Sequence, residues 1–181
     1  MKNLRDGERM KELSKVNEFI DIKMLVMDVD GTLTNGDIYI SENGEIMKAF
    51  NVKDGLGISV LLKEEGVIPA IITGRKSKII DVRANELGVN EIYQGIDNKV
   101  RVLKNIAIKY AIDLNNIAYI GDDINDLECI KICGVTACPQ DSSDTIKKYV
   151  DYVCKMDGGR GAVREFIEFL FKLRKVQRNE I

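Results

Sequence analysis

The chain has 181 residues, of which 45% are hydrophobic and 31% are charged, and its formal net charge is −2. This balance predicts one soluble globular domain and excludes a strong overall attraction to nucleic acid or to anionic membranes. Because the sequence contains no histidine, it also excludes a Ser-His-Asp or Cys-His nucleophile and any histidine acid or base. Chemistry must therefore come from carboxylates, lysine, arginine, hydroxyls or a metal ion.

The first residues carry no predicted targeting signal. Residues 1–20 are too charged to contain the apolar core of a signal peptide, and no apolar run reaches the ~18 residues that a membrane-spanning helix needs. We therefore expect a cytoplasmic protein with an N-terminal extension over residues 1–20, a single domain over residues 21–176 and a tail over residues 177–181.

Short apolar runs alternate with amphipathic patterns along the rest of the chain. Strands are expected at residues 22–27, 67–72, 91–93, 117–120 and 134–137, and helices near residues 57–65, 76–87, 99–110 and 162–175. This alternation is typical of βαβ units with right-handed crossovers. We predict an α/β fold with a Rossmann-like parallel sheet and helices on both of its faces.

One segment interrupts the alternation. Residues 37–50 have two β-prone arms around Asn43-Gly44, which is the strongest short signal for a β-hairpin. Because the segment directly follows Asp30, we expect the hairpin to project over the top of the sheet. Exposed apolar side chains on such arms favour pairing into a closed oligomer. The apolar side chains in question are Ile38, Ile40, Ile46 and Phe50.

Acidic side chains gather where the predicted strands end, which is the edge of an open parallel sheet where ligands bind. Together with a hydroxyl and a lysine, they form the set Asp28, Asp30, Thr73, Lys99, Asp122, Asp123 and Asp126. A single aspartate at a strand end is more often a helix cap, but several neighbouring carboxylates repel one another and favour a hard divalent cation. An all-oxygen site with room for water and phosphate suits Mg²⁺.

These residues also resemble a known family. Residues 28–32, Thr73, Lys99 and residues 121–126 are similar, in this order, to the four motifs of the haloacid dehalogenase superfamily. The resemblance implies that Asp28 attacks phosphorus and forms an aspartyl-phosphate. It further implies that Asp30 protonates the leaving oxygen and later deprotonates the hydrolytic water.

The same resemblance implies roles for the other motif residues. Mg²⁺ would be held by the carboxylate of Asp28, the backbone carbonyl of Asp30 and Asp122. The phosphoryl oxygens would be bound by Thr73 and Lys99. The waters of the metal ion, or Lys99 itself, would be oriented by Asp123 and Asp126.

A finer resemblance concerns a capless subgroup of this superfamily, the 3-deoxy-D-manno-octulosonate 8-phosphate phosphatases. Residues 48–55, 71–75 and 158–165 carry it, and with the core motifs the similarity spans about residues 22–171. Apart from the hairpin, the gaps between the motifs leave no room for a cap domain. The subgroup consists of homotetramers in which hairpins pack together and neighbouring subunits complete each active site, and its product feeds lipopolysaccharide synthesis.

By matching position, the resemblance assigns contacts with a sugar acid phosphate to Asp30, Asn51, Val52, Lys53, Asp54, Gly55, Arg75, Arg83 and Lys99. An anionic sugar acid suits a guanidinium, which favours this role for both arginines over pairing with surface acids. Residues 54–57 are equally compatible with a helix-capping turn. Arg160 lies in a glycine-rich stretch that reads first as a flexible lead into the last helix, and Ser59 stands where several relatives have a basic residue.

Three functions remain open from the sequence. The first is a Mg²⁺-dependent phosphatase for 3-deoxy-D-manno-octulosonate 8-phosphate. The second is a phosphatase for the 9-phosphate of a nine-carbon sugar acid, either N-acylneuraminate or its deaminated analogue. The third is an oligomerisation module with vestigial activity, which the complete set of motif residues disfavours because an unused site need not keep Asp30.

Overall fold

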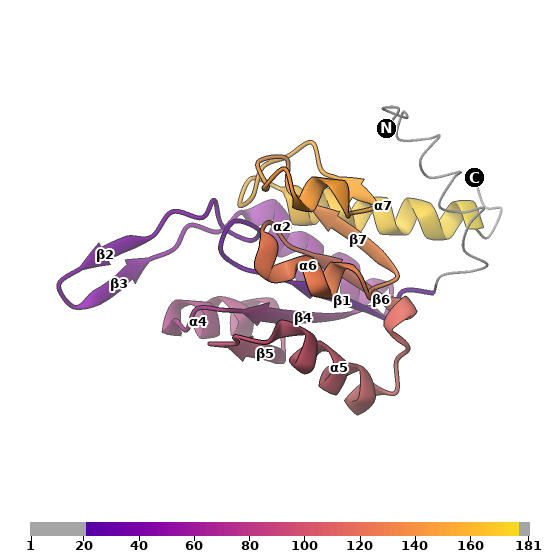
Figure 1. Ribbon diagram of the computed structural model, residues 1–181, viewed down its shortest axis with the longest axis horizontal. Coiled ribbons are helices and arrows are strands. Elements are labelled where there is room, and N and C mark those ends of the chain that lie inside the picture. Colours follow the sequence, from indigo (N-terminus) through magenta and orange to yellow (C-terminus); the bar gives the residue numbers. More distant parts are fainter. Residues whose placement is uncertain (1–20, 178–181) are drawn as a thin grey trace.

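A computed structural model describes residues 21–177 of the chain. Six parallel strands form one sheet in the order β5-β4-β1-β6-β7-β8 (Figure 1). They are β1 (Met24–Met27), β4 (Ile68–Thr73), β5 (Glu91–Gln94), β6 (Ile117–Ile120), β7 (Val135–Cys138) and β8 (Tyr152–Val153). The α/β prediction and the five predicted strands are confirmed, whereas β8 is too short to show a periodicity in the sequence.

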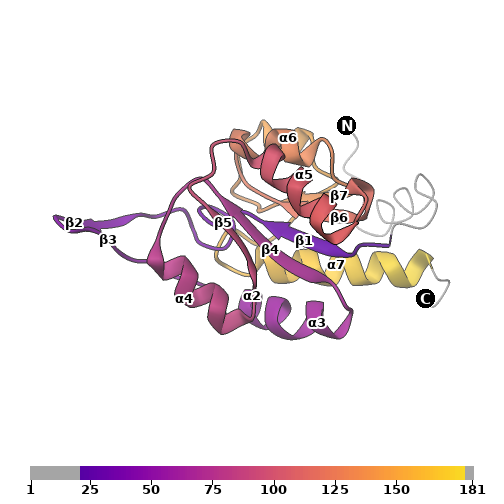
Figure 2. The same ribbon diagram turned by 90° about the horizontal axis from the view of Figure 1, so that it is seen from below.

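Helices cover both faces of this sheet (Figure 2). One face carries α2 (Val52–Leu56), α3 (Leu62–Glu64), α4 (Lys78–Leu87) and α7 (Ala162–Gln177), and the other carries α5 (Lys99–Tyr110) and α6 (Leu127–Ile130). Successive residues of β1 point to opposite faces, so Leu25 and Met27 join the first core and Met24 and Val26 the second. Burial on both faces explains why β1 is apolar throughout.

The helix predicted over residues 57–65 begins earlier, at Val52, and its middle turn over Gly57–Leu61 is π-helical. The apolar side chains of this first turn do not face the core, since Val52 is 80% exposed and Leu56 is 50% exposed. Asn51 caps it by accepting a hydrogen bond from the N–H of Lys53 at 2.8 Å. Helix α5 has the predicted bounds, and α7 extends to Gln177. The predicted N-terminal extension and residues 178–181 lie outside the described residues.

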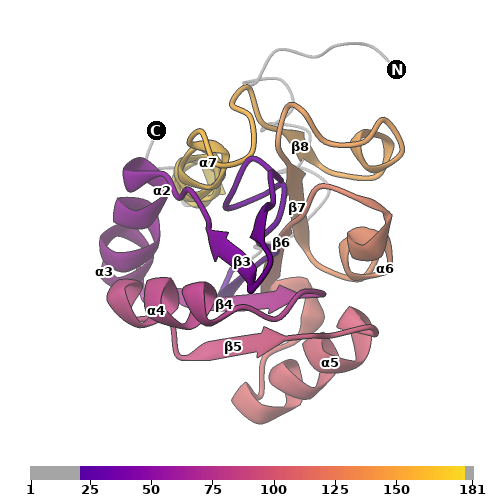
Figure 3. The ribbon, with the colours of Figure 1, turned by 90° about the vertical axis from the view of Figure 1, so that its left-hand side faces the viewer.

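The predicted hairpin is confirmed as an antiparallel pair, β2 (Tyr39–Ser41) and β3 (Gly44–Met47). It extends away from the body of the molecule (Figure 1) and lies over the carboxyl end of the sheet when seen end-on (Figure 3). Ile40 is 67% exposed and Ile46 is 58% exposed, so both arms present apolar side chains to solvent. Between Asp30 and Lys99 the described chain adds only this hairpin to the elements of the core, and it has no cap domain.

A helix that spans a membrane needs about 20 mostly apolar residues. No helix within residues 21–177 is both long enough and apolar enough to do so.

Candidate active site

Asp28 directly follows β1, which pairs with β4 on one side and with β6 on the other. Chain connections run in opposite directions from such a strand and leave a crevice at its carboxyl end. Asp28 is only 3% exposed there, and its N–H donates to the carbonyl of Ile120 at 3.0 Å. The structure thus places the predicted nucleophile at the switch point of the sheet.

Lys99, the first residue of α5, reaches this carboxylate from another element. Its Nζ lies 2.7 Å from Oδ1 of Asp28 and 2.7 Å from Oδ1 of Asp126, and the residue is 3% exposed. Burial alone would lower the pKa of Lys99, but the charges of the two carboxylates outweigh burial and raise it. Lys99 is therefore a fixed positive charge beside Asp28.

Asp126 holds this lysine in place from a fully buried position. Its Oδ1 also accepts from the hydroxyl of Tyr119 at 2.6 Å, and its Oδ2 accepts from the N–H of Asp122 at 3.1 Å. Tyr119 was not identified from the sequence, where it reads as one more core residue of an apolar strand. The feature of the sequence that could have identified Tyr119 is its hydroxyl group within an apolar strand, because a buried phenol needs a hydrogen-bond partner.

Three carboxylates meet in the crevice. Asp28, Asp122 and Asp126 each offer an oxygen atom, and these atoms lie within 4.8 Å of one another. Burial, followed by the charge of Asp126, raises the pKa of Asp28 to about 6, although Lys99 opposes the shift. Burial, followed by the charges of Asp28 and Asp126, raises the pKa of Asp122 to about 8. This excess of negative charge fits a hard divalent cation, which would relieve the repulsion.

The loop after β1 closes tightly on this group. Gly31 has a φ of +88°, and a Cβ atom built on it would lie 2.1 Å from Oδ2 of Asp122. Only glycine permits both that backbone conformation and that approach. The hydroxyl of Thr34 accepts from the N–H groups of Gly31 at 3.4 Å and Gly36 at 3.2 Å. The loop that carries Asp30 is therefore fixed next to Asp122.

The neighbouring strand β4 delivers Thr73, which is 1% exposed, and then Arg75. The side chain of Arg75 is 45% exposed, and its Nε lies 3.7 Å from Oδ2 of Asp30. Its Nη2 lies 3.6 Å from Oε1 of Glu45 in the hairpin. Arg75 thus lies at the exposed mouth of the crevice, where it faces Asp30 and Glu45.

Lys48, which follows β3, was not among the predicted site residues. Its Nζ contacts Oδ1 of Asp30 and lies 2.9 Å from Oε1 of Glu45, and its side chain is 0% exposed. Burial alone would lower the pKa of Lys48, but its hydrogen bonds to Asp30 and Glu45 raise it. The sequence pattern does not distinguish this lysine from a solvated one, because its burial depends on how the hairpin docks.

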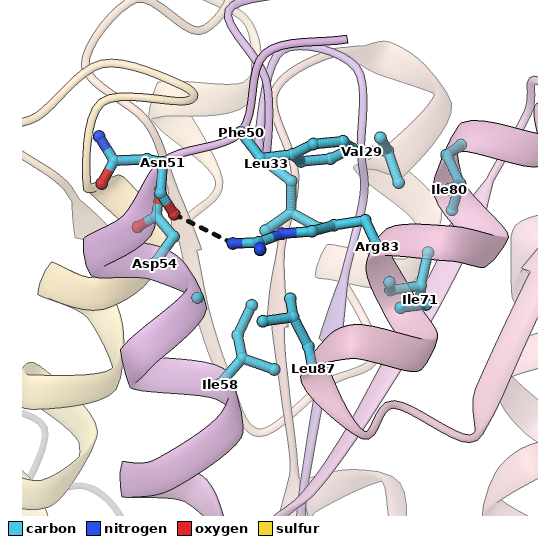
Figure 4. A pocket seen from close by; sticks show the side chains of 12 residues that line it. Val29, Leu33, Phe50, Asn51, Asp54, Ile58, Ile71, Ile80, Arg83 and Leu87 are labelled. Atoms are coloured by element: carbon cyan, nitrogen blue, oxygen red, sulfur yellow. Dashed lines mark hydrogen bonds between the residues drawn. The ribbon is translucent and has the colours of Figure 1, made fainter. Parts of the chain in front are cut away.

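The predicted substrate-binding segment, residues 51–55, lies at the start of α2 and faces Arg83 of α4 (Figure 4). Nη2 of Arg83 donates to the carbonyl of Asn51 at 3.5 Å, and its guanidinium lies 5.7 Å from the ring centre of Phe50. The space between the two helices is a cavity of about 10 Å³, which is room for about one water molecule. Arg83 therefore joins this segment to α4.

Asp54 points in another direction. It is 2% exposed, and its Oδ1 accepts from the N–H of Arg164 at 2.8 Å in the first turn of α7. Burial raises its pKa, although backbone N–H groups at the start of α7 act in the opposite sense. Asp54 therefore caps a helix from across the fold, whereas its neighbours Val52 and Lys53 are exposed.

Asp123 also acts as a local cap. Its carboxylate accepts from the N–H of Ile124 at 2.8 Å, and the residue is exposed. Within the described part of the chain it makes no hydrogen bond to Lys99, so its orienting role remains a prediction. Metal binding by the backbone carbonyl of Asp30 likewise remains a prediction.

With this geometry established, the chain was compared with known proteins. The sequence model of the haloacid dehalogenase-like hydrolases matches residues 58–167. The 3-deoxy-D-manno-octulosonate 8-phosphate phosphatase KdsC of Escherichia coli K12 is 42% identical over 150 residues, which are 83% of this chain and 79% of that protein.

Solved structures are similar as well. The enzyme of the same name from Moraxella catarrhalis, solved with magnesium ion, phosphate ion and KDO, has a TM-score of 0.84 and 38% identity, and the match covers 96% of each chain. The cobalt-bound deoxy-D-mannose-octulosonate 8-phosphate phosphatase from Haemophilus influenzae has a TM-score of 0.83 and 33% identity, with 87% of this chain and 92% of that chain covered.

Proposed function

The chain belongs to the haloacid dehalogenase-like hydrolase family, and from this we propose that it is a Mg²⁺-dependent phosphatase for 3-deoxy-D-manno-octulosonate 8-phosphate. The observation that carries the proposal is the buried carboxylate of Asp28, which lies 2.7 Å from the ammonium of Lys99 and beside Asp122. The similarity to the E. coli phosphatase over most of both chains supports the choice of substrate.

The proposed reaction has two steps. In the first, a carboxylate oxygen of Asp28 attacks phosphorus, the bond between phosphorus and the sugar oxygen breaks, and the carboxyl proton of Asp30 passes to that oxygen. In the second, water attacks the phosphorus of the aspartyl-phosphate, Asp30 takes a proton from the water, and the bond to Asp28 breaks. Inorganic phosphate leaves, and both aspartates return to their starting states.

The residues of the crevice suit a magnesium ion. Asp28 and Asp122 would hold it through their carboxylates, together with the carbonyl of Asp30. When bound, Mg²⁺ supplies positive charge that stabilises the transferring phosphoryl group and relieves the repulsion between the carboxylates. Lys99 and the hydroxyl of Thr73 would bind the phosphoryl oxygens, while Asp126 keeps the ammonium of Lys99 directed at the site.

The sugar acid would be bound at the mouth of the crevice. Arg75 has an exposed guanidinium there, which suits a carboxylate or a sugar hydroxyl. Arg83 and residues 51–55 form the adjoining wall. Within that wall Lys53 is exposed and available to a ligand, whereas the carboxylate of Asp54 is engaged with α7. We therefore assign Asp54 to shaping the wall.

We also propose self-association into a homotetramer. The hairpin exposes the apolar side chains of Ile40 and Ile46, and α2 exposes those of Val52 and Leu56. Pairing of hairpins between subunits would bury them. Sedimentation at micromolar concentration tests this directly, because a monomer would contradict a site that is shared between subunits.

A phosphate-release assay over sugar acid phosphates tests the activity. We expect strong preference for the 8-phosphate of 3-deoxy-D-manno-octulosonate over the 9-phosphates of N-acylneuraminate and its deaminated analogue, and no turnover after chelation of Mg²⁺. Preference for a 9-phosphate would reassign the substrate, and a negligible rate with all three in a stable tetramer would identify an assembly module. Asp28→Asn should be inactive, whereas Asp144→Asn, at a side chain that is 97% exposed, should retain wild-type activity.

A further inference from the structure

Lys48 is a buried positive charge on an otherwise exposed element. The neighbouring hairpin residues Ile46 and Met47 are 58% and 48% exposed, yet the side chain of Lys48 is 0% exposed. Long lysine side chains normally keep their ammonium groups in water, and burial is expensive unless the charge is paired. The position of Lys48 therefore depends on the carboxylates that surround its ammonium group.

The charges around that ammonium come from three elements. Asp30 arrives from the loop after β1, Glu45 from β3, and Arg75 from the loop after β4. Lys48 contacts Oδ1 of Asp30, while Arg75 approaches Oδ2 of the same carboxylate at 3.7 Å. Glu45 lies 2.9 Å from Lys48 and 3.6 Å from Arg75. Two acidic and two basic side chains thus form one contiguous group.

Within this group the two cations are not equivalent. The side chain of Arg75 is 45% exposed and its distances exceed those of direct hydrogen bonds, so it is available to a ligand. Lys48 is fully enclosed and makes direct contacts with both acids. The side chains of Asp30 and Glu45 are 18% and 12% exposed, so solvent screens these contacts little.

We propose that Lys48 is a positioning residue for the reaction: held by Glu45, it fixes the carboxylate of Asp30 in the orientation that both proton transfers require. This inference rests on the proposed function, because it assigns Asp30 the acid and base roles. In this role Lys48 acts through Asp30 and not on phosphorus or on the leaving oxygen. A carboxylate that is free to rotate would spend less time in line with the leaving oxygen or with the attacking water.

The arrangement also couples the hairpin to catalysis. Glu45 lies in β3 and Lys48 directly follows that strand, whereas Asp30 belongs to the catalytic loop. Any displacement of the hairpin would withdraw the ammonium from Asp30. The hairpin therefore does more than extend away from the molecule, because its second arm supplies two of the charged side chains around Asp30.

The experiment replaces Lys48 with methionine, which has a similar length but no charge, and compares two substrates. One is 3-deoxy-D-manno-octulosonate 8-phosphate, whose alkoxide needs a proton in order to leave. The other is p-nitrophenyl phosphate, whose phenolate leaves without one. In Lys48→Met we expect kcat/KM for the sugar phosphate to fall by about 100-fold, the lower range of acid–base catalysis. The kcat/KM for p-nitrophenyl phosphate, which reports formation of the aspartyl-phosphate, should change little.

The second half-reaction gives a further readout. With p-nitrophenyl phosphate, Lys48→Met should release one p-nitrophenolate per active site in a rapid burst, because hydrolysis of the aspartyl-phosphate still needs Asp30 as the base. A purely structural role of Lys48 would lower both activities together and produce no burst. Lys48→Arg, which keeps the charge, should recover much of the sugar phosphate activity, and Glu45→Gln should show the pattern of Lys48→Met more weakly.

Lys104→Met is the matched control, since it removes a lysine from an exposed position of α5, and it should behave as wild type. Equal losses of activity with both substrates would overturn the inference. A raised KM with unchanged kcat would also overturn it, because Lys48 would then be a substrate ligand. If Lys48→Met does not fold, Glu45→Gln carries the same test with Lys48 intact. A wild-type protein that hydrolyses neither substrate would refute the proposed function itself, whereas an active wild type with a fully active Lys48→Met would refute only this inference.

Discussion

The three carboxylates of the crevice predict an unusual dependence of stability on pH in the metal-free protein. Asp28 and Asp122 have pKa values of about 6 and about 8 in the folded chain, against an ordinary value of 3.8. The folded state therefore binds protons more tightly than the unfolded state does. The stability that these protons confer is complete below about pH 4 and is lost as the pH rises through about 6 and then about 8.

The magnitude follows from the shift at Asp28. A rise in its pKa from 3.8 to about 6 corresponds to about 3 kcal/mol in the free energy of unfolding. Asp122 acts in the same direction, but the two carboxylates repel each other, so their contributions are not additive. The raised pKa of Asp54 also makes the folded state less stable as the pH rises. The lowered pKa of Glu45 has the opposite effect, because the stability that it contributes is present above its ordinary value of 4.5 and is lost at lower pH.

Urea unfolding of the chelator-treated protein provides the assay. We expect the free energy of unfolding to be lower at about pH 8 than at about pH 4 by about 3 kcal/mol or more. Mg²⁺ at about a hundred times its dissociation constant should add about 3 kcal/mol at the higher pH, and less at the lower pH because protons compete for the same oxygens. Equal stability at both pH values would refute the described packing. Asp122→Asn should flatten the dependence, and the exposed Asp144→Asn should leave it unchanged.

Three substitutions test the supporting contacts. Gly158→Ala would place a Cβ atom 2.0 Å from the carbonyl oxygen of Gly31, so it should cost about 3 kcal/mol in urea unfolding and lower kcat by displacing the catalytic loop. Tyr119→Phe removes the hydroxyl that donates to Asp126 at 2.6 Å; a loss of about 2 kcal/mol with a lower kcat is expected, and unchanged kcat would show that this bond does not support Lys99. Glu91→Gln weakens three hydrogen bonds to two tyrosines and a lysine. Because Glu91 lies at the amino end of the edge strand β5, stability should fall by about 1 kcal/mol while kcat stays at the wild-type value.

Much of the fold and the core of the site could be predicted from the sequence. The apolar run before Asp28 and the alternation that follows it predict a parallel sheet, and the ends of parallel strands must meet at one edge. That rule alone brings Asp28 and Asp122 together. Lys99 could be placed because the helix that it opens begins at the same edge.

Other features depend on tertiary contacts that local patterns do not encode. Lys48 resembles any lysine on a hairpin until the docking of the hairpin encloses it beside Asp30. Asp54 belongs to a segment that resembles a turn, and its role at α7 requires the packing of two helices that are distant in the chain. The start of α2 was missed because Gly55 and Gly57 make residues 54–57 resemble a turn.

Asp28 is proposed to carry the phosphoryl group during turnover. The most direct test of this role is rapid acid quenching of the protein with Mg²⁺ and 3-deoxy-D-manno-octulosonate 8-phosphate, followed by digestion and mass spectrometry. We expect one added phosphoryl group on the peptide that contains Asp28, located at that residue and absent when substrate is omitted or when Asp28→Asn is used. Substrate turnover with no phosphorylated peptide at any quench time, or with the group on another residue, would contradict it.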